Sequence, residues 1–159
     1  MGNIAYVSRR RGSEITTDQF LSTVKSINNE HFDGVFTIEM IFDDHGVQVS
    51  IDGEVWWQWW KESSRRWGGK YPSRRGKLGD WARTKFDTLI AIKLKCILSD
   101  EGVTGSWEPD PKYAGTFEQY MENAYSHMHT TTRDAFITFM TEEERARAPQ
   151  SLVKFISIP

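Results

Sequence analysis

Cysteine is nearly absent from this chain, since Cys96 is the only one among 159 residues. A single thiol excludes an internal disulfide framework and a cysteine-rich zinc site. Long apolar runs are absent too, because the longest one, 89–98, is too short to span a bilayer and is interrupted by Lys93 and Lys95. The first residues contain no apolar run of signal-peptide length. We therefore expect a cytoplasmic protein with a reduced thiol and no membrane partner.

The composition that remains is typical of one globular domain. The length of 159 residues, with 38% hydrophobic and 26% charged side chains, predicts a single domain over 1–159 with its own core. Aromatic residues make up 13% of the chain and include seven tryptophans. Large rings of this kind belong either to a core or to a contact surface.

Charge is distributed unevenly along the chain, although the formal net charge is only −2. Residues 61–85 carry nine basic and two acidic side chains, whereas acidic residues outnumber basic ones in both 1–60 and 99–148. A net charge this small gives no whole-molecule attraction to nucleic acid or to an anionic membrane. The basic block suits the steering of a charged partner, or it is a solvated loop whose charges pair with the acidic stretches.

Alternating apolar residues predict antiparallel strands in the first half of the chain. The alternation in 34–43, and again in 47–52, is typical of half-buried strands. The dipeptide Asp-Gly at 52–53 is a strong hairpin signal, after which 54–60 returns as a third strand. Contiguous hairpins followed by helices predict the α+β class, an antiparallel β-meander with helices packed against the sheet.

Capping residues and helical spacing predict the other elements. Thr16 and Gln19 form a capping box at the start of a helix of about three turns. Residues 61–78 are rich in glycine and basic residues without a period, which predicts a long surface loop. Strands are also expected over 4–8 and 151–158, and a short strand or turn over 103–113. A helix is expected over 79–102, although its segment 89–98 could form a strand instead. Two further helices are expected to begin at the capping boxes Thr116/Gln119 and Thr141/Glu144.

Motifs for catalysis or metal binding are weak in this chain. His127 and His129 would lie on different faces of a helix, so they would not share a metal ion. Cys96 lies in an apolar segment, where a thiol is more often inert than reactive. We therefore predict a protein with no catalytic residue, no metal ligand and no cofactor. A small enzyme with an unrecognised site is kept as an alternative.

Tryptophan and basic residues are interleaved in 56–77. Four tryptophans within 56–60 lie at neighbouring strand positions and so occupy both faces of a sheet. Trp67 and seven basic side chains follow within 61–77. Rings next to arginine and lysine can stack bases and hold phosphates, and they can equally anchor a protein interface or form core. Segment 56–77 therefore makes a nucleic-acid-binding module an alternative function, although the acidic overall balance predicts only weak binding of nucleic acid.

Two segments of the chain resemble a known class of proteins. One is IAYVSRRRGSEITTDQFLSTVKSI within 4–28, and the other is LIAIKLKCILSDEGVTGSWEPDPKY within 80–113. They resemble small bacterial immunity-type proteins that are encoded beside secreted polymorphic toxins. The resemblance implies a cytoplasmic α+β protein without catalysis, which binds one cognate toxin acting in the cytoplasm and neutralises it by occlusion.

Two sets of residues are candidates for contact with such a toxin. A nuclease has a basic cleft, which an inhibitor would complement with carboxylates. The acidic set that could do this, with one aromatic anchor, is Asp100, Glu101, Trp107, Glu108, Asp110, Glu118 and Glu122. A nucleotide-binding toxin would instead be met by an anchor from the basic set, which is Arg65, Arg66, Trp67, Arg74 and Arg75. The acidic set is the preferred surface.

Overall fold

Seven strands and four α-helices build the fold, and the computed structural model describes residues 3–157. The strands are β1 (Ile4–Ser8), β2 (Thr37–Ile41), β3 (Gly46–Ile51), β4 (Glu54–Ser63), β5 (Arg66–Lys70), β6 (Ile97–Asp100) and β7 (Val103–Trp107). The helices are α1 (Thr17–His31), α2 (Gly76–Leu94), α3 (Phe117–Ala124) and α4 (Thr130–Arg147), with two 3₁₀ helices, η1 (Pro111–Ala114) and η2 (Gln150–Phe155).

The described strands form one antiparallel sheet in the order β2-β3-β4-β5-β1-β6-β7. The predicted meander over 34–60 is confirmed as β2, β3 and β4, and the predicted strand over 4–8 is β1. Because β1 pairs with β5 on one side and with β6 on the other, it joins the meander to the β6–β7 hairpin. The predicted α+β class is therefore correct, and the sheet is larger than the meander alone.

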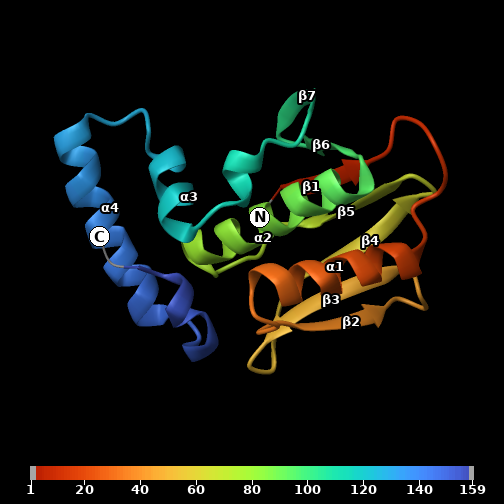
Figure 1. Ribbon diagram of the computed structural model, residues 1–159, viewed down its shortest axis with the longest axis horizontal. Helices are drawn as coiled ribbons and strands as arrows, with labels where there is room; N and C mark the ends of the chain where they lie inside the picture. Colours follow the sequence, from red (N-terminus) through yellow and green to blue (C-terminus); the bar gives the residue numbers. More distant parts are fainter. Residues whose placement is uncertain (1–2, 158–159) are drawn as a thin grey trace.

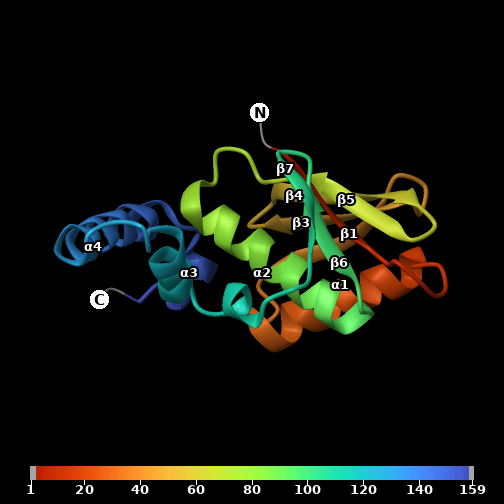
Figure 2. The ribbon, with the colours of Figure 1, turned by 90° about the horizontal axis from the view of Figure 1, so that it is seen from above.

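The main core lies between one face of the sheet and helices α1 and α2, which Figures 1 and 2 place on the same side. Phe20 of α1 stacks on Trp67 of β5, with ring centroids 4.2 Å apart, and meets Trp59 edge-on. Phe32, the C-cap residue that follows α1, stacks in the same way on Phe86 of α2, at 4.8 Å. These aromatic pairs hold each helix against the sheet and against its neighbour.

The predicted surface loop over 61–78 is wrong. Strand β4 continues to Ser63, β5 follows as a paired strand, and α2 begins at Gly76. Two of the three glycines that suggested a loop lie inside β5, where a Cβ atom on Gly69 would overlap the carbonyl oxygen of Gln58 in β4, and the third is the first residue of α2. Glycine in a strand often marks such a close approach of two backbones. In the sequence alone, however, glycines of this kind cannot be distinguished from those of a turn.

The predicted helix over 79–102 is correct only as far as Leu94. Lys95 adopts a left-handed conformation with φ of 55°, and the amide of Cys96 donates to the carbonyl of Ala91 at 2.8 Å. This geometry ends the helix without a glycine. The chain then enters β6, so the alternative of a strand over 89–98 holds only for its last two residues. The short strand or turn expected over 103–113 begins with a strand, β7.

The C-terminal segment differs from two of the predicted elements. No cap lies at Thr141, which is inside α4 and donates its hydroxyl to the carbonyl of Ile137 at 2.7 Å. The predicted strand over 151–158 is wrong, because Gln150–Phe155 form η2, and Ile158 lies outside the described residues. The predicted capping box at Thr116/Gln119 is confirmed with both of its hydrogen bonds, whereas at Thr16 only the N-cap half is present, in which the Thr16 hydroxyl accepts the amide of Gln19.

Figure 1 shows α3 and α4 beyond the end of α2 that is nearer its first residues, away from α1. Phe117 of α3 meets Trp81 of α2 edge-on at 5.8 Å, which attaches this C-terminal part to the core. Within residues 3–157, no helix has both the length and the apolar character needed to cross a membrane.

The single thiol gives a direct test of the core. Cys96 is 3% exposed, burial raises the pKa of its thiol, and the neighbouring Arg9 lowers it by a smaller amount. We expect Cys96 to react with an aromatic disulfide reagent at least about tenfold more slowly in the native protein than in denaturant, because reaction requires local opening. Reaction in native buffer at the rate of an exposed thiol would show that the α2–β6 junction is not packed as described.

Candidate functional site

The edge strand β7 is exposed along its whole length. It lies at one end of the sheet order, with β6 as its neighbour. Val103 and Trp107 have exposed fractions of 56% and 40%, and Tyr113 in η1 has 37%. Exposed apolar side chains beside an edge strand favour the docking of another protein, because the outer backbone groups of such a strand can pair with a further chain.

Four carboxylates of the predicted acidic set surround this strand. Asp100 is the last residue of β6, Glu101 lies in the turn, and Glu108 and Asp110 follow Trp107 directly. Five of the seven residues of that set therefore flank one exposed strand, two of them at the hairpin turn and three at the other end of β7, and we call them the acidic edge. The acidic edge comprises Asp100, Glu101, Trp107, Glu108 and Asp110. The other two, Glu118 and Glu122, lie on α3 and not on the hairpin.

Three carboxylates of the acidic edge also hold the local backbone. The Asp100 side chain accepts the amide of Gly102 at 2.7 Å, and the Glu101 side chain accepts the amide of Ile4 at 3.0 Å. Asp110 accepts the amide of Lys112 at 3.0 Å and thereby caps η1. These bonds fix the carboxylates in place, so that their charge is presented by a structured surface.

A cavity of about 400 Å³ opens beside the acidic edge, and we call it the edge pocket. Figures 1 and 2 show α2, the β6–β7 hairpin and η1, the elements that supply most of its walls. Its lining residues are Ala5, Tyr71, Thr84, Asp87, Thr88, Leu98, Ser99, Val103, Trp107, Asp110 and Tyr113. The walls are mainly aromatic and aliphatic, with a few polar groups, which is the usual character of a binding pocket.

Asp87, which lines the edge pocket, belongs to a buried ion pair with Arg83, which does not line it. Arg83 and Asp87 lie one turn apart on α2, with Nε and Oδ2 at 2.9 Å. The Trp59 indole donates to the other carboxylate oxygen at 3.0 Å, and the guanidinium also donates to the carbonyls of Gly69 and Lys70. Both ends of the pair are thus hydrogen-bonded, as a buried pair requires.

The environment of this pair shifts two pKa values. Burial raises the pKa of Asp87, and the Arg83 guanidinium and its hydrogen bonds partly oppose the shift. Burial also raises the pKa of Tyr71 to about 12, with a further contribution from the charge of Asp87. Tyr71 is therefore a neutral phenol at neutral pH and lines the edge pocket in that form.

The predicted basic set is not a single surface. Arg65 and Arg66 lie at the start of β5, whereas Arg74 and Arg75 follow its other end, and Trp67 between them is fully buried. Five strand residues span about 17 Å, so the two arginine pairs are well separated. The Trp67 indole donates to the carbonyl of Ile15 at 3.0 Å, which makes it a core residue and excludes the role of exposed anchor.

Sequence reasoning missed an arginine cluster that forms where β1 ends. The amide of Arg9 donates to the carbonyl of Arg65 at 2.9 Å, and the Arg65 guanidinium donates to the carbonyl of Arg10 at 3.2 Å. Arg66 stacks on the ring of Tyr6 at 3.8 Å. The pairing of β1 with β5 creates this proximity, and nothing in the local pattern of either segment indicates it.

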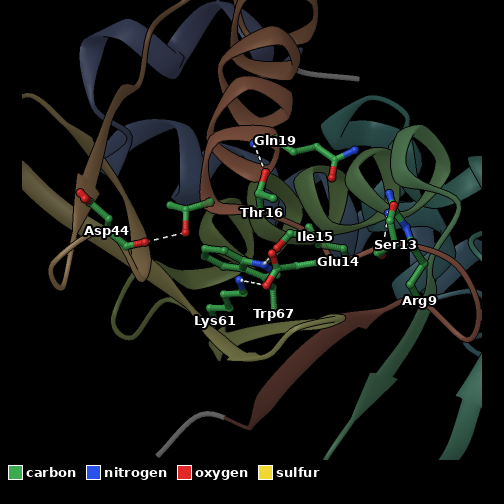
Figure 3. A network of polar contacts seen from close by, with 10 residues as sticks. Arg9, Ser13, Glu14, Ile15, Thr16, Gln19, Asp44, Lys61 and Trp67 are labelled. Atoms are coloured by element: carbon green, nitrogen blue, oxygen red, sulfur yellow. Dashed lines mark hydrogen bonds and ion pairs between the residues drawn. The ribbon is translucent and has the colours of Figure 1, made fainter.

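The loop between β1 and α1 is held by the contacts drawn in Figure 3. Arg9 donates to the carbonyl of Ser13 at 3.0 Å, and the Lys61 ammonium lies 2.7 Å from the Glu14 carboxylate. Together with the bond from Trp67 to Ile15, these contacts bind the loop to β4 and β5. The loop therefore presents its arginines from a fixed position.

The tryptophans of β4 are mostly core. Trp56, Trp57 and Trp59 are 6% exposed or less, and only Trp60 in this group is half-buried. Strand β4 therefore does not expose consecutive aromatic rings on which nucleic-acid bases could stack. Within residues 3–157, no group of three or more histidine, cysteine, aspartate or glutamate side chains could hold a metal ion.

No protein-family model, curated protein or solved structure is significantly similar to this chain. What the site can bind therefore follows from its own shape and chemistry.

Proposed function

We propose that this protein is an immunity-type inhibitor that binds a cognate toxin acting in the cytoplasm and blocks it by occlusion. The acidic edge carries the proposal, because it combines an exposed edge strand, an exposed tryptophan and four carboxylates. Charged groups around an apolar centre suit recognition of a basic protein surface, such as the nucleic-acid cleft of a nuclease.

Each part of the acidic edge has a separate role in this binding. The outer backbone of β7 can pair with an extended segment of the toxin, which adds a strand to the sheet. Trp107, at the end of β7, supplies exposed apolar contact area, and tryptophan is a frequent hot-spot residue. The carboxylates steer the encounter and complement the positive charge of the partner. Occlusion needs no catalytic group on this chain.

Co-expression tests the proposal directly. The product of the neighbouring gene is expressed alone and together with this chain in the same host. We expect growth arrest in the first case, rescue in the second, and a stable complex that survives size-exclusion chromatography. The proposal would be contradicted if co-expression did not restore growth and no complex formed.

One observation favours the alternative of nucleic-acid binding. The arginine cluster near Tyr6 offers positive charge next to an aromatic ring, a combination that holds single strands. The overall charge of −2 and the burial of most β4 tryptophans oppose strong binding.

We therefore expect weak binding of nucleic acid. Dissociation constants for single-stranded DNA or RNA should exceed roughly 1 µM at ~0.15 M salt, as for non-specific phosphate contacts. Fluorescence anisotropy with labelled oligonucleotides measures this. A dissociation constant below about 0.1 µM at the same salt would favour the nucleic-acid alternative over the inhibitor.

A further inference from the structure

The edge pocket has an unusual combination of linings. Three aromatic side chains, Tyr71, Trp107 and Tyr113, contribute to its walls, and two carboxylates, Asp87 and Asp110, are its only charged lining residues. None of the described residues that line it is basic. Aromatic faces and carboxylates attract the same kind of group, because both present negative electrostatic potential to a cation.

We propose that the edge pocket receives the guanidinium of an arginine side chain from the toxin. This inference rests on the proposed function and names the group by which the toxin is anchored at the acidic edge. The pocket adjoins β7, so a toxin segment paired along that strand would bring its side chains to the pocket mouth.

Guanidinium fits the pocket better than a neutral or an anionic group. Its planar face can stack on Trp107 or Tyr113, while its N–H groups reach a carboxylate at the rim. The apolar stem of arginine matches the aliphatic walls formed by Leu98 and Val103. An ammonium has the same charge but no planar face, and its stronger hydration makes it the poorer ligand.

The two carboxylates of the pocket do not contribute equally. Asp87 is already bound by Arg83 and the Trp59 indole, so its charge is largely matched. Asp110 is exposed, and its second oxygen lies 3.9 Å from the Lys112 ammonium, which is too long for a strong bond. Asp110 is therefore the carboxylate that an incoming guanidinium would engage.

Lys112, which does not itself line the pocket, shows that a cation is accommodated beside two of its lining residues, Asp110 and Tyr113. Its ammonium lies over the ring of Tyr113, at 5.0 Å from the centroid, as well as near Asp110. An incoming guanidinium would compete with Lys112 for both groups. Removing the lysine charge should therefore improve binding, whereas removing the Asp110 charge should weaken it.

The test uses the full chain and small probes of defined chemistry. N-acetyl-arginine N-methylamide is titrated against ¹⁵N-labelled protein, and the lysine and norleucine analogues serve as charged and neutral comparisons. The Trp107 indole resonance, identified by its loss in Trp107→Phe, reports binding at the pocket. The half-buried Trp60 indole, which does not line the pocket, is the internal control.

We expect a saturable shift of the Trp107 resonance with the arginine probe, a smaller one with lysine and the smallest with norleucine. Asp110→Asn should weaken the arginine affinity by roughly threefold or more, and Lys112→Met should strengthen it by a similar factor. Both side chains are exposed, so these variants are expected to keep the fold. Unchanged circular dichroism checks this.

Several outcomes would overturn the inference. Equal effects of the arginine and norleucine probes would show a merely apolar groove, and no shift at Trp107 with any probe would show no site. A toxin complex that tolerates Asp110→Asn and Lys112→Met unchanged would remove the arginine anchor while leaving the inhibitor function intact. If the arginine probe bound but no toxin complex formed, the pocket would be shown to bind guanidinium, whereas the proposed inhibitor function would be contradicted.

Discussion

Replacing Arg83 by methionine is expected to lower the free energy of unfolding by about 3–5 kcal/mol, the range for removing one partner of a buried ion pair. The guanidinium is fully buried and donates to Asp87 and to the carbonyls of Gly69 and Lys70. Methionine keeps most of the apolar volume but leaves the Asp87 carboxylate uncompensated in the core. Urea denaturation followed by tryptophan fluorescence measures the change.

An exposed ion pair provides the matched control. Lys93 and Glu30 lie 3.3 Å apart with side chains 35% and 53% exposed, so Lys93→Met should cost less than about 1 kcal/mol. The double variant Arg83→Met/Asp87→Leu should recover part of the lost stability, because it removes the unpaired charge. Equal costs for Arg83→Met and Lys93→Met would contradict the description of the buried pair.

The second large effect is expected from Glu144→Gln, at about 1–3 kcal/mol of unfolding free energy. Helix α2 has no capping side chain of its own, and Glu144 of α4 accepts the amides of Lys77 and Leu78 at 3.1 and 3.4 Å. Glutamine keeps the shape but loses the charge at the positive end of the helix and one of two acceptors. The same urea titration reports the loss.

Glu143→Gln is the control for this prediction. Glu143 precedes Glu144 in the same helix turn but is exposed, so its replacement should change stability by no more than about 0.5 kcal/mol. A Glu144 variant as stable as the Glu143 variant would show that α4 does not cap α2. Because Glu144 links α4 to the start of α2, its loss should also increase hydrogen exchange in both segments.

Local signals in the sequence were sufficient for the meander and for two helix starts. Period-two alternation and the Asp-Gly turn at 52–53 specify β3 and β4 through neighbouring residues alone. Thr16 and Thr116 cap helices through amides three residues away. Features of this kind are predictable because both partners lie within a few positions of the chain.

Features that depend on distant partners were not predictable. Gly69 suggested a loop in the sequence. It lies inside β5, where a glycine is needed because the β4 backbone passes close to it. Glu144 was interpreted as part of a local cap, whereas its carboxylate is bound by amides 66 and 67 residues away. Lys95 ends α2 in a left-handed conformation that usually requires glycine, so the composition gave no sign of the boundary.

The candidate site was predicted in part for the same reason. Asp100, Glu101, Trp107, Glu108 and Asp110 are close in sequence, and they flank one exposed strand, two at the β6–β7 turn and three at the other end of β7. The basic set was also close in sequence, but β5 separates its two ends and buries Trp67. The edge pocket combines residues from across the chain, so no local pattern could have indicated its aromatic lining.

The most direct test is the affinity of an acidic-edge variant for the proposed toxin, which would be the product of the neighbouring gene. Trp107→Ala/Glu108→Lys is the suitable change, because neither side chain caps the hairpin or η1, and Arg65→Glu/Arg74→Glu is the control at the basic set. The account predicts at least about thirtyfold weaker binding for the edge variant, as for loss of a hot-spot residue, and little change for the control. Unchanged affinity of the edge variant, together with loss of binding in the arginine variant, would contradict it.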